Sequence, residues 1–338
     1  MKDSKRIQWI DVLRGIGIII MVMGHVGFGG KFDRWIHSYH MPLFFIVSGF
    51  LYDGQAKNLK QFIYRKFRTL LVPYVFFIFI NYFAWLILEQ DSSLLLPLLA
   101  ALTYNTHGLP IAGACWFLTA MFFTEIIYCV LQKTLHDPRV LCGAAMALAI
   151  GISYVETTLG FILPLAFLQG LVGVGFLQIG RLFGLLLKNE SVKEPSEVCM
   201  GFRIVFGVAL LAFNVVLSFV NGYVNVKDGS YSNILLFWGN AVIGTVAIAL
   251  LAIAIEKNFH RLRAILIKIG QYSIVFLGLN QLIIRLFYRT GLPYVGETGQ
   301  LSISRLVGSI VITIGTLEVL LLISRLLMSG KLKVIFGK

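Results

Sequence analysis

The sequence predicts an all-α integral membrane protein with about ten transmembrane helices and both termini in the cytoplasm. Hydrophobic residues make up 58% of the 338 residues and charged residues only 13%, a composition too apolar for a water-facing surface. Apolar runs of about 20 residues are long enough for a helix to cross a bilayer. Because lipid offers the backbone no hydrogen-bond partners, spans are helices or closed barrels, and these runs far exceed the ~10 alternating residues of a barrel strand.

Ten apolar segments follow one another along the chain. The second is short for a span and contains Pro42 and Gly49, so we expect it to be broken or re-entrant. The first follows a basic start like that of a signal peptide, but Arg14 lies inside it and no small-residue cleavage site follows, so we predict that it is retained. The segments lie at residues 7–27, 39–53, 69–90, 112–132, 140–158, 161–187, 202–222, 232–256, 265–288 and 303–328.

The lysines and arginines indicate the orientation. With the N-terminus inside, 22 of the 29 fall in the predicted cytoplasmic connections and termini, six fall outside, and Arg14 lies in the membrane. This asymmetry follows the positive-inside rule and supports an even number of spans. A net charge of +13 is also compatible with nucleic-acid binding, but cations scattered through short loops favour orientation, and we expect no nucleic-acid partner.

A single membrane domain is predicted to fill residues 1–338. The sequence shows no fixed-period repeat, no low-complexity linker and no charge block that would mark a second domain. The four cysteines, at positions 115, 129, 142 and 199, have no CxxC spacing. We therefore expect neither a disulfide framework nor a metal site.

Arg14 is the most unusual residue of the first segment. An arginine inside an apolar helix costs about 2.5–3.5 kcal/mol even on lenient insertion scales, so its side chain is expected to face protein. His25 follows three helical turns plus about 20° later, so the two side chains share one helix face about 16 Å apart. Asp11 lies on nearly the same side and could pair with Arg14. Alternatively, Arg14 and His25 each reach the nearest membrane surface.

Two further motifs follow the first segment. Residues 40–52 read HMPLFFIVSGFLY, in which His40 precedes a proline-started segment that a Ser-Gly pair interrupts. This pattern predicts the entrance to a bent membrane segment. Three cations then gather in the sequence RKFR at 65–68, at a cytoplasmic helix entrance. Such a cluster attracts either anionic lipid headgroups or a phosphorylated cytosolic ligand.

Together and in this order, the motifs resemble acyltransferase family 3. The resemblance is strongest over residues 7–130 and is closest to the short branch that includes fucose 4-O-acetylase-like proteins, without an appended esterase-like domain. It rests on Arg14 and His25, His40-Met-Pro-Leu-Phe-Phe, Ser48-Gly49-Phe50, Arg65, Arg68, Pro73-Tyr74, Trp116-Phe-Leu and Glu125.

The resemblance implies a membrane protein of about ten helices that moves an acyl group, usually acetyl, to a sugar hydroxyl of a surface or secreted glycan. It also implies that acetyl-CoA is the donor and enters from the cytoplasm. We accordingly expect a multi-pass protein of the cell membrane whose partners are the bilayer, acetyl-CoA and a glycan or lipid-linked sugar acceptor.

The resemblance also implies roles for single residues. Arg14 and His25 match the family's paired arginine and histidine, with Arg14 on the donor side and His25 near the reacting thioester. A histidine suits this chemistry because its unperturbed pKa of about 6.5 lets it accept a hydroxyl proton at neutral pH. His25 could instead carry the acyl group briefly itself, but we favour direct transfer.

Arg65 and Arg68 match the family's basic pair and are assigned to the CoA phosphates, and Ser48 is placed in the same donor site. Glu125 is either catalytic or, as we favour, the structural partner of an arginine or histidine. His40 either positions the acceptor or caps its segment. Trp116 is assigned to the substrate site.

Asn280 is a departure from the family pattern. It occupies the place where many relatives carry a histidine after a similar Gly-x-x-Ser run, and an amide cannot shuttle a proton at neutral pH. We assign Asn280 to the substrate site, which leaves His25 as the stronger candidate base.

Two other functions stay open beside a membrane O-acyltransferase. A transporter or flippase of a glycan intermediate would also use ten helices and intramembrane polar residues such as Asn81, Asn214 and Asn240. A non-catalytic membrane domain is the third possibility. The arginine cluster suited to CoA and the shared face of Arg14 and His25 favour the O-acetyltransferase.

Overall fold

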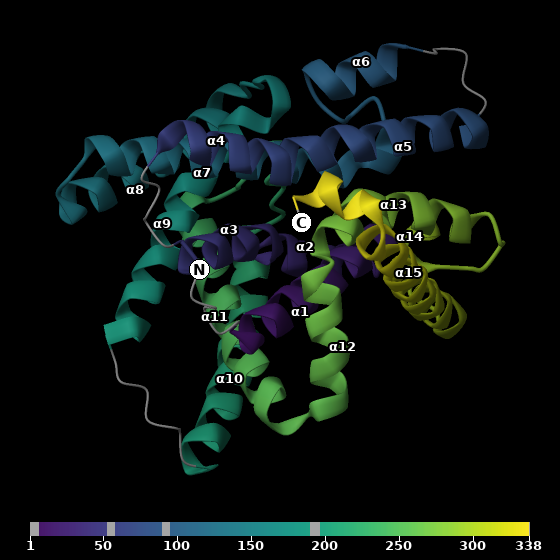
Figure 1. The fold of residues 1–338 in the computed structure, drawn as a ribbon. Helices are drawn as coiled ribbons and strands as arrows, with labels where there is room; N and C mark the ends of the chain where they lie inside the picture. The colour runs from purple at the N-terminus through teal and green to yellow at the C-terminus, as the bar shows by residue number, and fades with distance from the viewer. Residues whose placement is uncertain (1–6, 53–57, 90–94, 190–196, 338) are drawn as a thin grey trace.

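The computed structural model describes residues 7–52, 58–89, 95–189 and 197–337, and its regular structure within these ranges is entirely helical (Figure 1). The longer helices are α1 (Gln8–Val26), α5 (Val72–Glu89), α7 (Trp116–Thr134), α8 (Pro138–Leu159), α9 (Phe167–Asn189), α10 (Glu197–Asn221), α11 (Ile234–Asn258), α13 (Ser273–Tyr288) and α15 (Ile303–Ser329). The shorter ones are α2 (Gly30–His37), α3 (His40–Phe50), α4 (Leu59–Lys66), α6 (Leu96–Thr103), α12 (His260–Gln271) and α14 (Val295–Thr298).

Brief helical turns complete the chain. A π-helical turn, Phe67–Leu71, joins α4 to α5 directly before Pro73, whose ring removes a backbone donor and disturbs the regular ladder of the preceding turn. The 3₁₀ turns are Pro110–Cys115, Pro164–Ala166 and Lys331–Phe336.

Among the described residues, eight helical stretches are long and apolar enough to cross a membrane, and they coincide with eight of the ten predicted segments. The predicted segment 265–288 is instead the pair α12 and α13, which meet at 85° and raise the number to nine if counted as one span. The predicted segment 39–53 is α3, whose 11 residues are too few to cross a bilayer alone. The all-helical architecture is therefore confirmed and is that of an integral membrane protein, with eight candidate spans, or nine with the bent pair, among the residues that the structure describes.

The short helix α3 lies inside the bundle. Its Gly49 packs on the backbone of Leu177 in α9, and Gly180 of α9 packs in return on the backbone of Ile46 in α3. A Cβ at either glycine would overlap the facing carbonyl oxygen. Small residues that let two backbones approach closely are typical of helix contacts in membranes.

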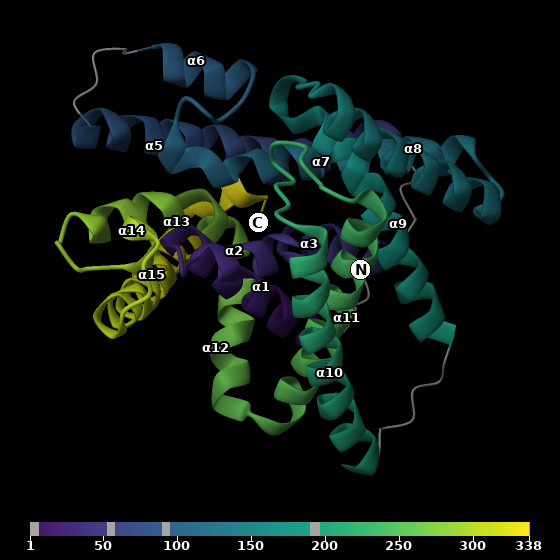
Figure 2. The ribbon, with the colours of Figure 1, turned by 180° about the vertical axis from the view of Figure 1, so that it is seen from behind.

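Helix α1 is the centre of the fold. It contacts α3, α11, α12, α13 and α15. In the two opposite views of Figures 1 and 2, α1 crosses the middle of the molecule. Its contact with α12 is again made through glycines, because Gly15 faces the carbonyl of Leu266 and Gly270 faces the carbonyl of Asp11. Residues on α1 are thus held by neighbours on several sides.

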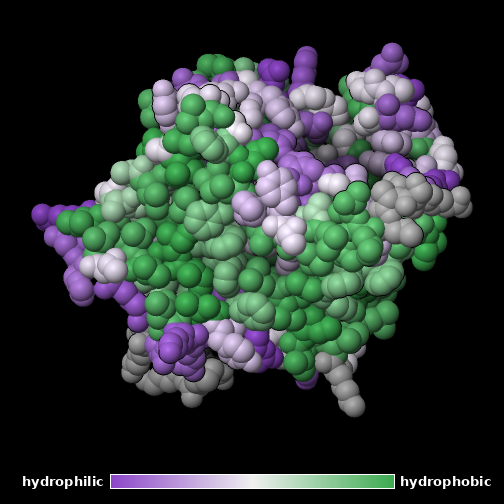
Figure 3. Space-filling model, turned by 90° about the horizontal axis from the view of Figure 1, so that it is seen from above, coloured by the Kyte–Doolittle hydropathy of each residue, from purple (hydrophilic) through white to green (hydrophobic). Residues whose placement is uncertain are grey.

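The outer surface carries an apolar belt. Figure 3 shows hydrophobic residues spread over one face of the molecule, with hydrophilic residues gathered along its upper and lower edges. Helix α10 illustrates the belt, since Phe202 and Val205 are 67% and 69% exposed. Such a surface is suited to lipid, because lipid tails do not penalise exposed apolar side chains.

Cys115, Cys129 and Cys142 are free thiols, and the first two are buried in helix contacts. The side chain of Cys199 and residues 1–6, which the orientation argument uses, lie outside the described residues.

Candidate functional site

His25 stands at the C-terminal end of α1, where the helix is fastened to its neighbours. Gly27 ends the helix with a positive φ of 79°, and its N–H donates to the Met23 carbonyl. The hydroxyl of Tyr288 in α13 donates to the carbonyl oxygens of His25 and Val26, at 3.1 and 3.0 Å. The backbone that carries His25 is therefore fixed against α13.

The His25 ring is oriented by Asn280. Its Nδ1 lies 2.6 Å from Asn280 Oδ1, across 255 residues of chain. The amide nitrogen of Asn280 donates to the carbonyl oxygens of Phe276 and Leu277, both at 2.9 Å, so the amide oxygen is the atom that faces the ring. Because this oxygen only accepts, Nδ1 of His25 carries the hydrogen and Nε2 has the free lone pair.

Two cavities meet at His25. Cavity A has a volume of about 710 Å³ and is lined by His25, Trp85, Glu89, His107, Gly108, Pro110, Ile111, Gln281, Ile284, Arg285 and Tyr288. Cavity B has a volume of about 300 Å³ and is lined by Met21, His25, His37, His40, Met41, Thr106, His107, Pro110, Gly113, Ala114, Trp116, Asn225, Val226, Lys227, Leu277 and Gln281. Three polar side chains line both cavities, those of His25, His107 and Gln281.

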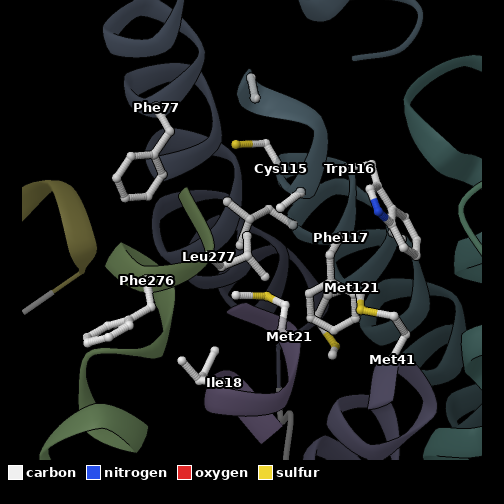
Figure 4. Close-up of a cluster of buried hydrophobic side chains, with 14 of the residues drawn as sticks. Ile18, Met21, Met41, Phe77, Cys115, Trp116, Phe117, Met121, Phe276 and Leu277 are labelled. Carbon is white, nitrogen blue, oxygen red and sulfur yellow. The ribbon is translucent and has the colours of Figure 1, made fainter. Parts of the chain in front are cut away.

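The floor of cavity B is apolar and rich in methionine. Figure 4 shows Met21 and Met41 gathered with Met121, Phe117 and Leu277 where α1, α3, α7 and α13 converge. Methionine side chains are flexible and fill irregular gaps, so this floor can change shape more easily than one of branched side chains.

Two more histidines of cavity B are fixed through their backbones. His37 Nδ1 lies 2.8 Å from the carbonyl of Asp33, and His40 Nδ1 lies 2.7 Å from the carbonyl of Ile36. The two rings meet edge to face at 4.9 Å. Burial lowers the pKa of His37, so this imidazole is neutral at physiological pH. Each Nδ1 donates to a carbonyl, which leaves each Nε2 as an acceptor.

The loop between α10 and α11 closes cavity B from one side and contributes Lys227. Its Asp228 accepts a hydrogen bond from His107 Nε2 at 2.9 Å, which attaches the loop to the segment before α7. Burial lowers the pKa of Lys227. A lysine at the wall of cavity B was not predicted from the sequence.

The fold can be divided into a half around His25, which contains both cavities, and a half around Arg14 at the opposite end of α1. Glu125 lies in the second half, away from both cavities. It is 5% exposed, accepts a hydrogen bond from Ser48 at 2.7 Å and forms an ion pair with Lys66. The structure therefore gives it a cation partner, although that partner is a lysine rather than the arginine or histidine that we expected. The Glu125 carboxylate joins α3, α4 and α7.

The remaining predicted residues divide between the two halves. His25, His40 and Trp116 line cavity B, and Asn280 contacts His25. Arg14 lies half-buried on α1, three turns before His25. Arg65 is exposed beside the Phe62 ring, and Arg68 lies in the π-helical turn. The structure thus brings His25, His40, Trp116 and Asn280 together and leaves Arg14, Ser48, Arg65, Arg68 and Glu125 elsewhere.

Comparison with known proteins identifies the family. A family model described as an acyltransferase domain, the one for acyltransferase family 3, matches residues 7–325, nearly the whole chain. The chain belongs to acyltransferase family 3. It is also similar to nodulation protein NolL of Mesorhizobium japonicum, with 27% identity over 182 residues that cover 49% of this chain and 46% of that protein. The match thus spans about half the length of that relative. No solved structure matches the chain.

The sequence analysis missed three residues that this acyltransferase places at the cavities. His107, Lys227 and Gln281 come from loops or from a helix predicted only as a span. The sequence could have indicated Gln281, because it follows Asn280 directly. Two adjacent polar side chains inside an apolar segment are costly unless they have hydrogen-bond partners or a function. The loop residues had none, since charged loop residues are usually solvated.

Proposed function

We propose that this membrane acyltransferase transfers an acetyl group from acetyl-CoA to a hydroxyl of a cell-surface or lipid-linked glycan. The observation that carries the proposal is the position of His25, whose tautomer is set by Asn280 where two cavities meet. A reaction between two substrates needs such a meeting point, with a base within reach of both.

In the proposed reaction, His25 acts as a general base through Nε2. It takes the proton of the acceptor hydroxyl while the hydroxyl oxygen forms a bond to the thioester carbon. The tetrahedral intermediate then breaks its carbon–sulfur bond, and the imidazolium returns the proton to the leaving thiolate to give free CoA. An ester and a thiol replace an alcohol and a thioester, and no acyl-histidine is needed.

Cavity A suits a carbohydrate acceptor. It combines the rings of Trp85 and Tyr288 with polar groups on Glu89, Arg285 and Gln281. Arg285 donates to Glu89 at 2.8 Å, so both planar groups are already held in place. Sites for small molecules typically combine apolar walls with a few fixed polar groups, and a sugar offers ring faces to one and hydroxyls to the other.

The donor is proposed to enter from the half that contains Arg14. In the orientation inferred from the charge distribution this half is cytoplasmic, and Arg14, Arg65 and Arg68 are candidates for the CoA phosphates. The extended pantetheine arm would then follow α1 toward His25. Ile18 and the methionine-rich floor of cavity B fill that path, and the flexibility of Met21 and Met41 supports their displacement.

The principal test is acetyl-CoA turnover by the purified protein in detergent, with the release of CoA thiol as readout and water as the acceptor. His25→Ala should lower this rate by about 100- to 10,000-fold, the range for loss of a general base. His136→Ala is the matched control, because His136 is exposed and away from both cavities. Wild-type protein that neither binds nor turns over acetyl-CoA would contradict the proposed donor.

A transporter is less well supported, because the buried amides that suggested one are used in helix contacts. Asn81 donates to the carbonyls of Phe77 and Gly278, and Asn214 donates to Asn240 at 2.7 Å. Transport would be favoured over transfer if the His25→Ala variant still moved lipid-linked glycan and turned over acetyl-CoA at the same rate as wild type.

The orientation has its own test. In a variant whose four native cysteines are replaced by alanine, Ser230→Cys beside Lys227 should react with a membrane-impermeant maleimide from outside the cell. Arg261→Cys, at the start of α12 just beyond the C-terminal end of α11, should react only from inside. The reverse labelling pattern would place the donor entrance on the opposite side.

A further inference from the structure

Gln281 occupies the boundary between the two cavities. It follows Asn280 on α13, so consecutive side chains point about 100° apart, one to the His25 ring and the other to the junction of cavities A and B. The reaction proposed above counts this amide among the polar groups of cavity A but gives it no part in the transfer step.

The orientation of the Gln281 amide is fixed by the backbone. The N–H of Ala114 lies 2.9 Å from Gln281 Oε1, and because an N–H only donates, the atom that faces it must be the oxygen. The amide NH₂ group then points away from that contact. Within the described part of the chain, no residue accepts a hydrogen bond from Gln281 Nε2.

Gly113 provides the space for this arrangement. A Cβ at position 113 would lie 3.0 Å from Gln281 Oε1 and 3.2 Å from Nε2, which is closer than ordinary contact. The amide therefore lies against the turn Pro110–Cys115, and an alanine at 113 would displace it. Gly113 thus leaves room for the polar end of the Gln281 side chain.

Acyl transfer from a thioester creates a need for such a donor. When the hydroxyl oxygen bonds to the thioester carbon, the carbonyl π electrons move onto the carbonyl oxygen, and that oxygen becomes negatively charged. A fixed N–H aimed at this oxygen stabilises the transition state more than the ground state.

We propose that Gln281 Nε2 donates a hydrogen bond to the carbonyl oxygen of the acyl donor and stabilises the oxyanion of the tetrahedral intermediate. This inference rests on the proposed acyl transfer at His25. It makes Gln281 a catalytic residue, with His25 as the base and Asn280 as the residue that positions the base.

The other polar groups at the junction are less suited to this role. His25 Nε2 must accept the hydroxyl proton, so it cannot donate to the oxyanion during the attack. His107 already uses Nε2 on Asp228. Lys227 lines cavity B but not cavity A, so it does not reach the boundary that both substrates share.

The test compares Gln281→Met and Gln281→Glu with wild type in acetyl-CoA turnover with water as the acceptor. Methionine keeps the length without a donor, and glutamate places a second acceptor against the oxyanion. Both should lower kcat by about 100- to 1000-fold, as removal of one oxyanion donor does, with the KM for acetyl-CoA nearly unchanged. Gly113→Ala should lower kcat less, because it moves the amide without removing it.

A second readout separates catalysis from structure. In the infrared difference spectrum of bound acetyl-CoA with a ¹³C-labelled carbonyl, the carbonyl band should move to higher frequency in Gln281→Met than in wild type. Gln178→Met is the matched control, because Gln178 is buried in the other half and bonds to Tyr128 at 2.6 Å. It should leave the band and kcat per folded protein unchanged.

The failures of the two proposals are distinguishable. If Gln281→Met keeps wild-type kcat while His25→Ala abolishes turnover, the oxyanion role is wrong and the acyltransferase proposal stands. A rise in KM with unchanged kcat would also overturn the inference, since it would show uniform binding of the donor. If His25→Ala turns over acetyl-CoA like wild type, both proposals fail.

Discussion

The half of the molecule around His25 and the half around Arg14 use buried polar side chains in opposite ways. At the His25 end, His25 and Gln281 are each fixed by one atom and present another to a cavity. At the Arg14 end, Glu125 is engaged by Ser48 and Lys66. The first arrangement leaves hydrogen-bonding atoms at the cavity walls, whereas the second uses them to hold helices together.

A second network strengthens the contrast at the Arg14 end. The amide of Gln132 bridges the Tyr52 hydroxyl, at 2.9 Å, and the guanidinium of Arg181, at 3.0–3.1 Å. Arg181 also donates to the Tyr128 hydroxyl at 3.0 Å. These hydrogen bonds connect α7, α9 and the end of α3, and buried polar networks of this kind help to specify one helix arrangement.

The largest effect that would sharpen this contrast is expected at Glu125. Glu125→Ala should destabilise the protein by about 3 kcal/mol, because it leaves the Lys66 charge and the Ser48 hydroxyl without their acceptor. The measurement is the thermal unfolding midpoint in detergent. Glu318→Ala, on the exposed face of α15, is the matched control and should change little. If Glu125→Gln keeps the midpoint but loses turnover, the carboxylate takes part in the reaction and the contrast is broken.

The next largest effect is expected at Asn280. Asn280→Leu should lower turnover by about 100-fold, because the His25 ring loses the acceptor that selects its tautomer. Asn280→Asp keeps an acceptor at the same place and should retain most of the activity. The measurement is CoA release per folded protein. Equal activity of the leucine and aspartate variants would show that the 2.6 Å contact does not position the base.

A smaller effect is expected at the arginine pair. The double variant Arg65→Ala with Arg68→Ala should raise the KM for acetyl-CoA by about tenfold and lower kcat less, as expected for loss of charge-assisted contacts to phosphate. Arg139→Ala, at an exposed cation in the first turn of α8, is the control. An unchanged KM would move the phosphate site to other cations.

The smallest effect is a pH dependence at Asp33, on α2. Burial raises the pKa of Asp33 from 3.8 to about 6, and one carboxylate oxygen is buried without a hydrogen-bond partner among the described residues. The folded state therefore favours the protonated form of Asp33. The contribution of this proton to the stability of the fold is present below about pH 4 and is lost as the pH rises through about 6. Asp33→Asn should thus unfold at a higher temperature than wild type at pH 8, with no difference at pH 4. A constant difference across this range would contradict the raised pKa.

The apolar helices could be predicted from the sequence, but the bend between α12 and α13 could not. Hydrophobic length places ten segments, because a span needs about 20 apolar residues whatever surrounds it. The 85° bend at Gln271–Ser273 is different. Gly270, directly before the bend, packs against the carbonyl of Asp11, and this contact joins residues more than 250 positions apart, so no local pattern reveals it.

The candidate site divides in the same way. The shared face of Arg14 and His25 is a consequence of helical periodicity, and α1 contains both residues as predicted. The contacts of His25 with Asn280 and of Glu125 with Lys66 are tertiary, so the sequence could suggest that these side chains need partners without naming them. Lys227 belongs to a loop, where no periodicity relates its side chain to a cavity.

The bend has a consequence for how the bilayer acts on the enzyme. Two helices at 85° cannot both run along the membrane normal, so at least one of α12 and α13 is strongly inclined to it. Helix α12 begins with His260 and Arg261, both exposed, and ends on the Gly270 contact with α1. Anionic lipid headgroups attract an exposed arginine such as Arg261. The exposed, basic start of α12 is therefore joined, through the glycine contacts at Gly15 and Gly270, to the helix that carries His25.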